Sequence, residues 1–423
     1  MIKFIKPLSI YAASSLFSKG VSFLLLIVLT HYLSPGEQGI YTLFTVYVGV
    51  LFPIIHIGII NASQVEYFKM EKGNLRSYLV SSLSISVVIF VVISLLFFLL
   101  GNRAAERMNI SPGWLVLIPV VAFSRIIPSL VSAIYRSMEE ALKFTWYNVF
   151  MAIAYALFTL LFVLLFRMKW EGRILGTAAG GLLFFGIGLI ILHKKNLLGN
   201  FGEVKKEHQL SALKFGLPLI PHLLAVILID TSDKIFIANK MGVYEVGIYN
   251  MGYKFGALIL LMQNIFMNVW NPFLYKRLGN EGLRSKTEIV KQAWFFFILI
   301  VAAVGLLTLI SPFCFDHFID QRYKEGIQFV FWVALGYCFY SIFNMLGSII
   351  LYFKKTDVLS YMSVANVLLN MALNYYLIDI YGTIGAAYAT FISFFAIFIC
   401  CFIYVNSIVR LPWFDPSIVF SKE

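Results

Sequence analysis

The sequence predicts an all-α integral membrane protein whose twelve transmembrane helices form two six-helix lobes around a central cavity. Composition is the first observation: hydrophobic residues make up 60% of the chain and charged residues 13%, whereas about 25% of an ordinary soluble domain is charged. The second is a series of apolar runs, each long enough for the roughly 20 residues that a helix needs to cross a bilayer. The third is a short repeat between the two halves.

The apolar runs are taken as helices because lipid offers no hydrogen-bond partners to an open backbone, and because stretches such as "VVIFVVISLLFFLL" lack the alternation of a membrane barrel. The basic N-terminus resembles a signal peptide, but the first run is too long for one, so an uncleaved span is expected. The expected spans are 8–32, 40–66, 78–100, 114–135, 144–166, 174–193, 213–239, 246–272, 291–315, 327–352, 358–378 and 384–408.

Lysine and arginine predict how the spans are oriented. With the N-terminus inside, 21 of these residues fall on the cytoplasmic side and 8, among them Arg173, on the other side. This bias follows the positive-inside rule. It predicts a multi-pass membrane protein with both termini in the cytoplasm. The net charge of +12 is therefore attributed to topology, and no nucleic-acid partner is expected.

Two pairs of motifs indicate that the halves are related. "LSPGEQGIY" (33–41) and "MGVYEVGIY" (241–249) match at an offset of 208 residues, and "ILGTAA" matches "TIGAAY" at 209. We expect an N-lobe of spans one to six (1–198), a cytoplasmic linker (199–212) and a C-lobe of spans seven to twelve (213–423). Six is an even number, so the lobes would be parallel repeats with a site between them.

Four basic residues lie well inside the spans: Lys19, Arg125, Lys234 and Lys254. Each costs about 2.5–3.5 kcal/mol at a helix centre, so such residues usually face a bundle interior or a wet cavity. The simpler alternative is that some of them extend their charged ends to the membrane surface. The favoured interpretation is a cationic binding site.

The fourth span carries a polar stripe that supports a wet face. Arg125, Ser129, Ser132 and Arg136 follow one another at three- and four-residue spacing, which places them along one side of a helix. Prolines within or at the start of several spans, among them Pro53 in the second and Pro128 in the fourth, are predicted hinges.

The stretch "LIDTSDKIFI" (228–237) places three charges inside the seventh span. Asp230 and Lys234 are i, i+4 neighbours, and Asp233 lies three residues after Asp230, so they share a face and can pair. One interpretation is an internal ion pair that holds the span against its neighbours. In the other, Lys234 contacts a ligand while Asp230 and Asp233 tune it or act as a gate. The sequence leaves both open.

Weaker signals include three residues with possible roles in ion coupling: His56, His222 and Glu66. A lone histidine in a membrane span is more often a packing residue than a proton relay. The 4 cysteines lie in or beside apolar spans and suggest neither a disulfide framework nor a metal site. We predict no metal, cofactor or catalytic residue. An enzyme is not expected, because no loop is large enough to form a catalytic module.

Several motifs carry a family resemblance: "DTSDKIFIA" followed by "MGVYEVGIYNMGYKFG", "YLSPGEQGIYTL" after the first span, and "YGTIGAAYATFIS" at the twelfth. With them the chain resembles the polysaccharide-exporter branch of the multidrug/oligosaccharidyl-lipid/polysaccharide exporter superfamily, and is similar to Wzx-type O-antigen flippases. The resemblance implies a flippase that moves an undecaprenyl-diphosphate-linked oligosaccharide from the cytoplasmic to the outer leaflet by alternating access.

The resemblance also implies the partners: the lipid-linked oligosaccharide, membrane lipids, and polysaccharide polymerase and chain-length proteins. Four intramembrane cations against two acids would offset the charge of a diphosphate. The alternative is a cation-coupled drug or metabolite antiporter of the same superfamily. Such an antiporter needs unpaired acids in the first lobe, whereas the first span carries Lys19 and no acid.

Overall fold

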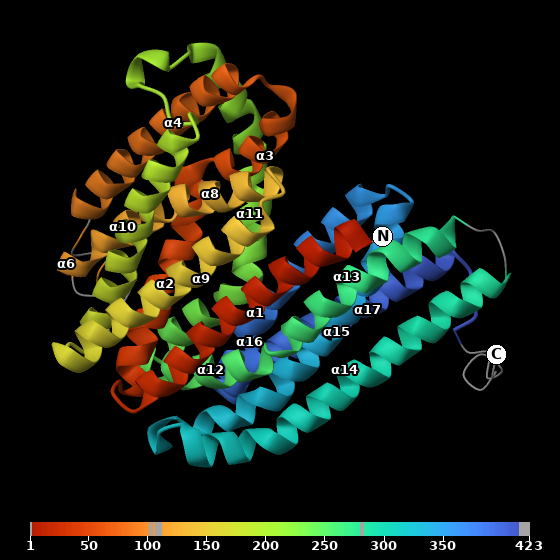
Figure 1. Cartoon of the computed structure of the whole chain (residues 1–423). Coiled ribbons are helices and arrows are strands. Elements are labelled where there is room, and N and C mark those ends of the chain that lie inside the picture. The colour runs from red at the N-terminus through yellow and green to blue at the C-terminus, as the bar shows by residue number, and fades with distance from the viewer. Residues whose placement is uncertain (1, 100, 102–104, 106–111, 280–282, 414–423) are drawn as a thin grey trace. The chain divides into compact units, whose positions relative to one another are not determined.

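The computed structural model describes residues 2–99, 101, 105, 112–279 and 283–413, and these form helices joined by short turns, with no strand among them (Figure 1). In the first half the helices are α1 (Ile2–Thr30), α2 (Pro35–His56), α3 (Ile59–Lys69), α4 (Lys72–Leu99), α6 (Pro112–Leu115), α7 (Leu117–Ser124), α8 (Ile126–Ser137), α9 (Ala141–Leu160), η1 (Leu161–Leu165) and α10 (Trp170–Lys194). In the second half they are η2 (Phe201–Glu203), α11 (Lys206–Lys240), α12 (Val243–Gly256), α13 (Ile259–Leu278), α14 (Leu283–Phe318), η3 (Gln321–Gly326), α15 (Ile327–Tyr352), α16 (Thr356–Tyr381) and α17 (Ile384–Ile408).

The prediction of a multi-helix membrane protein is confirmed. Within the described residues, 11 segments are long and apolar enough to cross a bilayer. The expected span that is not among these 11 is the eleventh, 358–378, which corresponds to the 26-residue helix α16. Three buried asparagines, Asn366, Asn370 and Asn374, make α16 more polar than the others. Its buried asparagine stripe suits a helix that packs inside a bundle.

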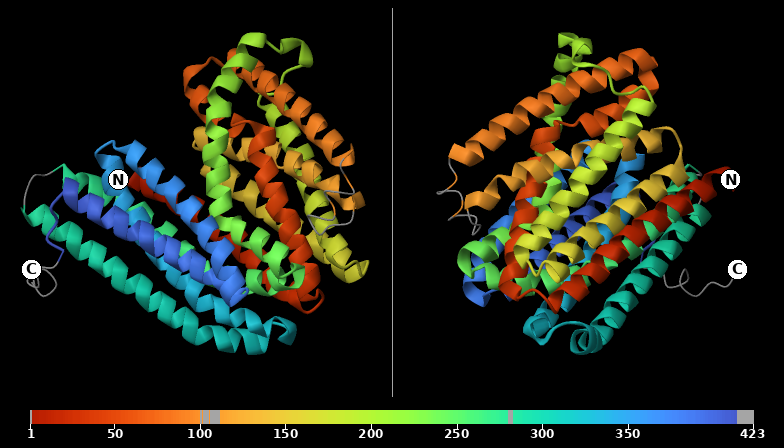
Figure 2. Two further views of the ribbon diagram at one scale, coloured as in Figure 1. Left: turned by 180° about the vertical axis from the view of Figure 1, so that it is seen from behind. Right: turned by 60° about the vertical axis from the view of Figure 1, so that its left-hand side comes forward.

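The chain divides into two compact units, Met1–Thr231 and Ser232–Glu423. The division falls within α11, so the N-terminal part of this helix packs with the first unit. Each unit has one central helix: the Pro112–Ser137 span in the first and the Gln321–Tyr352 span in the second are 67% buried. Both are the fourth span of their half. The views in Figure 2 show α15 lying among the other helices of the second unit.

The packing partners follow the same order in both units. In the first, α10 packs on α9 and α7, and α2 packs on α7. In the second, α17 packs on α16 and α15, and α12 packs on α15. The second, fourth, fifth and sixth spans of each half therefore make equivalent contacts, as expected of a duplicated six-helix unit.

Glycines allow helices to approach closely in both units. On α10, a Cβ added at Gly176 would lie 2.5 Å from the Cα of Thr159 on α9. On α12, a Cβ added at Gly252 would meet the backbone oxygen of Gly326, 2.0 Å away. Small residues at such positions are the usual means of packing membrane helices, because lipid provides no hydrophobic drive between them.

The repeated motif after the first span begins a helix. Ser34 caps α2, its hydroxyl accepting a hydrogen bond from the backbone N–H of Glu37, while the Glu37 carboxylate accepts one from the backbone of Ser34. Glu37 also pairs with Lys169 at 3.2 Å, just before α10. In the second unit the equivalent Glu245 accepts a 2.7 Å hydrogen bond from Thr383, just before α17. Both acids thus join the start of the second span to the start of the sixth.

Two spans of the first unit are broken. Between α2 and α3, Ile57 and Gly58 adopt positive φ angles of 40° and 64°, and a Cβ added at Gly216 of α11 would meet the Ile57 carbonyl. Between α7 and α8 the break falls at Arg125. Proline has no N–H, so Pro128 leaves the carbonyl of Ser124 without its helical partner. The predicted hinge at Pro128 thus coincides with a break.

The linker between the halves is bound along α4. Arg76 donates to both carboxylate oxygens of Glu203, one of them at 2.7 Å, and Ser77 donates to the Glu203 carbonyl at 2.7 Å. The backbone of Lys205 then donates to Ser81 at 2.9 Å. Hydrogen bonding by Arg76 lowers the pKa of the Glu203 carboxyl below its usual value.

A second charged cluster joins the turn after α8 to the end of α10. Glu140 pairs with Lys143 at 2.8 Å and with Lys195 at 3.0 Å. Burial raises the pKa of the Glu140 carboxyl, but the hydrogen bonds from the two lysines outweigh burial and leave that pKa below its ordinary value.

Candidate functional site

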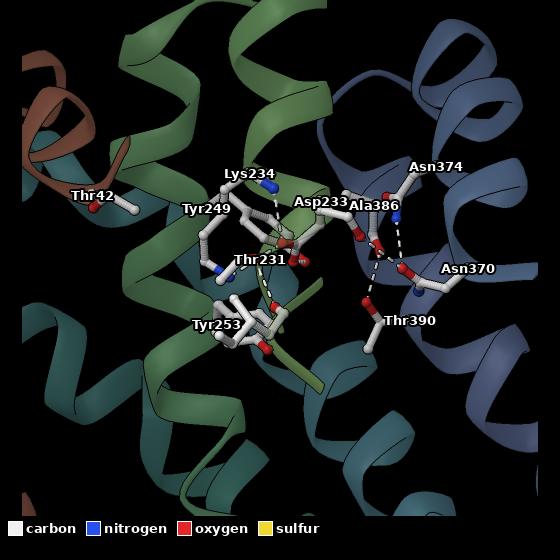
Figure 3. Close-up of polar contacts among 12 residues, drawn as sticks. Thr42, Thr231, Asp233, Lys234, Tyr249, Tyr253, Asn370, Asn374, Ala386 and Thr390 are labelled. Carbon is white, nitrogen blue, oxygen red and sulfur yellow. Dashed lines mark hydrogen bonds and ion pairs between the residues drawn. The ribbon is translucent and has the colours of Figure 1, made fainter. Parts of the chain in front are cut away.

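A buried polar cluster lies in the second unit (Figure 3). Asp233 and Lys234 of α11 are 2% and 4% exposed, and the Lys234 ammonium lies 3.2 Å from Oδ1 of Asp233. The Tyr249 hydroxyl of α12 donates to the other Asp233 oxygen at 2.7 Å. Buried charges need both a partner and hydrogen bonds, and this carboxylate has both.

Aromatic rings complete the surroundings of Lys234. Its ammonium lies 3.6 Å from the ring centroid of Tyr253 and 5.9 Å from that of Tyr249. The Tyr253 hydroxyl is hydrogen-bonded to that of Tyr337 on α15. A cation over desolvated aromatic faces is stabilised by the ring quadrupoles. This placement favours the interpretation that Lys234 forms an internal ion pair.

The polar cluster extends onto α16 and α17. Ser232 donates to Asn370 at 3.3 Å, Asn370 donates to Ser393 at 3.1 Å, and Asn374 donates to Asn370 at 2.9 Å. The Oδ1 atom of Asn374 has no hydrogen-bond partner within the described part of the chain. Sequence reasoning missed these asparagines, although their four-residue spacing in "NVLLNMALN" was a usable signal.

The other charges of the seventh and eighth spans lie at the surface. Asp230 and Lys254 are exposed, one near the middle of α11 and the other in the last turn of α12. Both side chains take part in interactions. Lys254 directly follows the buried Tyr253 in the sequence, and adjacent side chains of a helix project in different directions.

Two predicted cations belong to the first unit. Lys19 is exposed on α1, a helix that packs on α9. Arg125 is half-buried at the break between α7 and α8 and acts electrostatically on the hydroxyl of Tyr155 in α9. A cation exposed on a membrane-length helix faces either lipid or water, and lipid is the costly surrounding.

A cavity of about 460 Å³ lies within the first unit. Its lining comes from α2, α3, α8, α9 and α11: Phe52, Pro53, His56, Ile60, Asn61, Pro128, Ser129, Ser132, Arg136, Asn148, Met151, Leu223, Val226 and Ile227. The polar stripe predicted for the fourth span therefore reaches a cavity through three of its four members. Arg125, at the break that precedes α8, is not among the lining residues.

The three residues considered for ion coupling differ in their surroundings. His56 is 4% exposed, its ring lies tilted against that of Phe52 with the centroids 4.6 Å apart, and its Nδ1 has no hydrogen-bond partner among the described residues. His222 is exposed on α11, and Glu66 is half-buried on α3. Of the three, only His56 lines the cavity.

Arg173 is a buried cation that sequence reasoning assigned to the outer loops. It lies in the first turn of α10, is 8% exposed, donates to the Gln38 side chain, and places its guanidinium 3.9 Å from the Tyr41 ring centroid. The Tyr41 hydroxyl is 3.0 Å from that of Thr177. The helix begins earlier than the apolar run, which is why Arg173 was expected outside it.

The described residues contain no group of three or more histidine, cysteine, aspartate or glutamate side chains able to hold a metal ion. The cysteines among them are free. The chemistry available is therefore that of buried ion pairs, amides, hydroxyls and exposed cations on membrane-length helices.

Comparison with known proteins identifies relatives across most of the chain. The model of the family described as polysaccharide biosynthesis protein matches residues 4–277. A protein encoded at the Lsg locus of Haemophilus influenzae is 22% identical over 385 residues, covering 88% of this chain and 90% of the relative. The uncharacterized membrane protein MJ1375 of Methanocaldococcus jannaschii is 25% identical over 338 residues, covering 74% of this chain and 76% of the relative.

Solved structures share the fold. The lipid II flippase MurJ in an inward closed conformation aligns with a TM-score of 0.71 at 15% identity, covering 94% of this chain and 87% of that one. An inward-facing multidrug resistance MATE family transporter of the MOP superfamily aligns with a TM-score of 0.71 at 13% identity, covering 93% and 94%. These likenesses confirm the predicted two-lobe membrane fold.

Proposed function

Since the chain belongs to the polysaccharide biosynthesis protein family, we propose that it is a flippase for an undecaprenyl-diphosphate-linked oligosaccharide. The cargo would move from the cytoplasmic to the outer leaflet of a bacterial inner membrane, supplying repeat units to polysaccharide polymerase and chain-length proteins. Both termini would lie in the cytoplasm. The proposal includes no enzymatic step, because the diphosphate linkage is carried across intact.

The observation that carries the proposal is the exposure of cations on membrane-length helices. Lys19 on α1 and Lys254 on α12 are exposed, although a charge at the centre of a membrane helix costs about 2.5–3.5 kcal/mol. That cost is reduced where the lysine faces a water-filled path. Ammonium groups there would act as point-charge partners of a diphosphate, and Arg125 would add a guanidinium.

The described Asp233–Lys234 pair supports a more specific role for the seventh span. In this conformation the Lys234 ammonium is held by Asp233 and covered by Tyr253, so it would contact the diphosphate only after α11 moves. We therefore assign Lys19, Arg125 and Lys254 to the first contact with cargo. Lys234 would contact it later, and Asp230 and Asp233 would exchange partners as the transporter opens.

The lobes would alternate between cytoplasmic and outward openings while the polyprenyl tail stays in lipid. Moving an anion outward across an inside-negative membrane is favoured by about 2.3 kcal/mol per charge per 100 mV. The membrane potential would thus assist the release of a diphosphate-linked cargo. Coupling through His56, His222 or Glu66 is a further proposal within this scheme.

The test is complementation of a host that lacks its polysaccharide flippase, with surface glycan as the readout. The chain should restore the glycan, and Lys19→Gln, Arg125→Gln and Lys254→Gln should each lower it at equal protein level. Lys194→Gln, which removes an exposed charge at the end of α10, is the matched control. Full glycan with all three variants would refute the cationic site. Drug efflux without glycan would identify an antiporter instead.

A further inference from the structure

Apart from His56, the residues that line the cavity of the first unit have no role in the scheme above. We propose that it binds an oxyanion carried by the glycan part of the cargo: the carboxylate of an acidic sugar or a phosphate substituent. Arg136 is the cation of this site, and the N-terminal turn of α3 assists it. The proposal rests on the proposed function for the identity of the cargo.

The polar wall of the cavity comes from α8 and α9. Ser129, Ser132 and Arg136 project from one side of α8 at three- and four-residue spacing. Asn148 of α9 is fixed opposite them, donating at 2.8 Å to the Phe144 carbonyl and lying 3.3 Å from the Ser132 hydroxyl. These side chains offer hydroxyl and amide groups that are already oriented by the fold.

Arg136 supplies a charge suited to an oxyanion. Its guanidinium lies 5.5 Å from the ring centroid of Phe144, which restricts its position, and its side chain is exposed. A planar guanidinium matches a carboxylate or phosphate with two parallel hydrogen bonds. Arg136 is thus an anion-binding group on the wall of a cavity.

The break between α2 and α3 adds a second electropositive element. The α3 helix begins at Ile59 without a side-chain cap, so its first backbone N–H groups carry the partial positive charge of a helix start. His56, Ile60 and Asn61 bring this break to the cavity wall. Helix starts of this kind are established anion-binding elements.

His56 provides an independent sign that the cavity is built for a ligand. Its side chain is 4% exposed, it lines the cavity, and its Nδ1 lacks a hydrogen-bond partner among the described residues. Buried polar atoms without partners are uncommon in folded proteins. The imidazole packs in a tilted arrangement against Phe52, and a bound polar ligand would provide the partner that its Nδ1 lacks.

The cavity also has an apolar lining, which favours a ligand larger than a simple ion. Leu223, Val226 and Ile227 of α11 and Met151 of α9 are among its lining residues. A sugar ring presents hydroxyl groups at its rim and C–H groups on its faces, so it suits a cavity lined by both polar and apolar side chains. The volume of about 460 Å³ lies within the range of small-molecule pockets.

The experiment measures binding by saturation-transfer-difference NMR on the full chain in nanodiscs. The probes are D-glucuronate, D-glucose and inorganic phosphate. Glucuronate should bind the wild type, and Arg136→Gln should weaken it by roughly tenfold or more, because a charged hydrogen-bonded contact is lost. Arg136→Lys should fall between them, and Lys194→Gln should match the wild type. Ser129→Leu, which fills the cavity and keeps the charge, should also weaken binding.

Each alternative outcome is informative. Phosphate binding that depends on Arg136, without glucuronate binding, would assign the oxyanion to a phosphate group. Binding of neither anion would overturn the proposal, and so would equal binding of an anion by wild type and Arg136→Gln. Glucose that binds as well as glucuronate does would also overturn it. Melting curves of the variants show that each is folded.

Complementation separates this proposal from the proposed function. Glycan export by the wild type without anion binding in nanodiscs would refute the cavity site alone. Anion binding without export would leave the cavity site standing and count against the flippase.

Discussion

Replacing Lys234 with methionine should strongly destabilise the second unit, and replacing Asp233 as well should recover much of the loss. The single change removes the ammonium from the Asp233 carboxylate, 2% exposed, which keeps the neutral hydrogen bonds from the Tyr249 hydroxyl and the backbone N–H of residue 234. Breaking a buried pair from one side costs about 3–5 kcal/mol, whereas replacing both charges with similar shapes is often neutral. The stacking of the ammonium 3.6 Å over Tyr253 adds up to about 2 kcal/mol.

The assay is reversible unfolding of purified protein in mixed micelles, giving the free energy of unfolding of wild type, Lys234→Met, Asp233→Asn and the double variant. The double variant should be more stable than Lys234→Met by several kcal/mol. The matched control is the pair of Lys240 with Asp379, 2.6 Å apart and also anchored on α11. Its aspartate is 57% exposed, so Lys240→Met should cost at most about 1 kcal/mol.

A loss of stability in the double variant equal to the sum of the losses in Lys234→Met and Asp233→Asn would refute the internal ion pair, because the two side chains would then be energetically independent. Glycan export by the same variants separates the two roles of Lys234. If the double variant recovers both stability and glycan export, the pair is structural. If it recovers stability but does not export glycan, the ammonium of Lys234 is itself needed during transport.

Two further predictions concern the first unit. The pKa of Glu203 is lowered by Arg76, so this contact contributes fully above the ordinary glutamate value of 4.5 and is lost as pH falls through the lowered pKa. Protection of the Lys205 amide against hydrogen exchange, relative to its intrinsic rate at each pH, should therefore fall in that acid range, and Arg76→Ala should lower this protection already at neutral pH. On α10, Gly176→Ala places a Cβ 2.5 Å from a backbone atom of α9 and should lower the free energy of unfolding by about 1–3 kcal/mol in the same assay. Its control, Gly186→Ala, places a Cβ where no atom lies within 4 Å and should raise the free energy of unfolding by about 0.5–1 kcal/mol. Equal effects of the two variants would contradict close packing at Gly176.

The helices were predictable because bilayer thickness and backbone hydrogen bonding leave few alternatives for a long apolar run. Even α16, with three asparagines, coincides with an expected span. Ser129, Ser132 and Arg136 were predicted to share a wet face, and they line a cavity. Arg125 is not among the lining residues, although its carbonyl accepts the helical hydrogen bond of the Ser129 N–H. Spacing shows which residues lie along one side of a helix, whereas the neighbouring helices decide which of them line a cavity.

The polar core of the second unit was harder to predict because its contacts depend on packing between helices. Helical spacing indicated Asp230 as the partner of Lys234, yet the described ion pair joins Lys234 to its neighbour Asp233. A lysine side chain is long enough to curl back to an adjacent residue. Which way it turns is decided by Tyr249 and Tyr253 on α12, and the sequence does not show which helix faces α11.

The two halves retain one arrangement with different chemistry. Tyr41 and Tyr249 occupy equivalent positions of the repeated motif, and each lies beside a buried cation. In the first unit the cation is Arg173, from the sixth span, hydrogen-bonded to an amide; in the second it is Lys234, from the first span of its half, paired with a carboxylate. Helix packing is set by small residues that a duplication preserves, whereas a buried charge can be supplied from any neighbouring helix. The sequence repeat therefore predicts how the helices of each unit pack, whereas the buried polar contacts must be established for each unit separately.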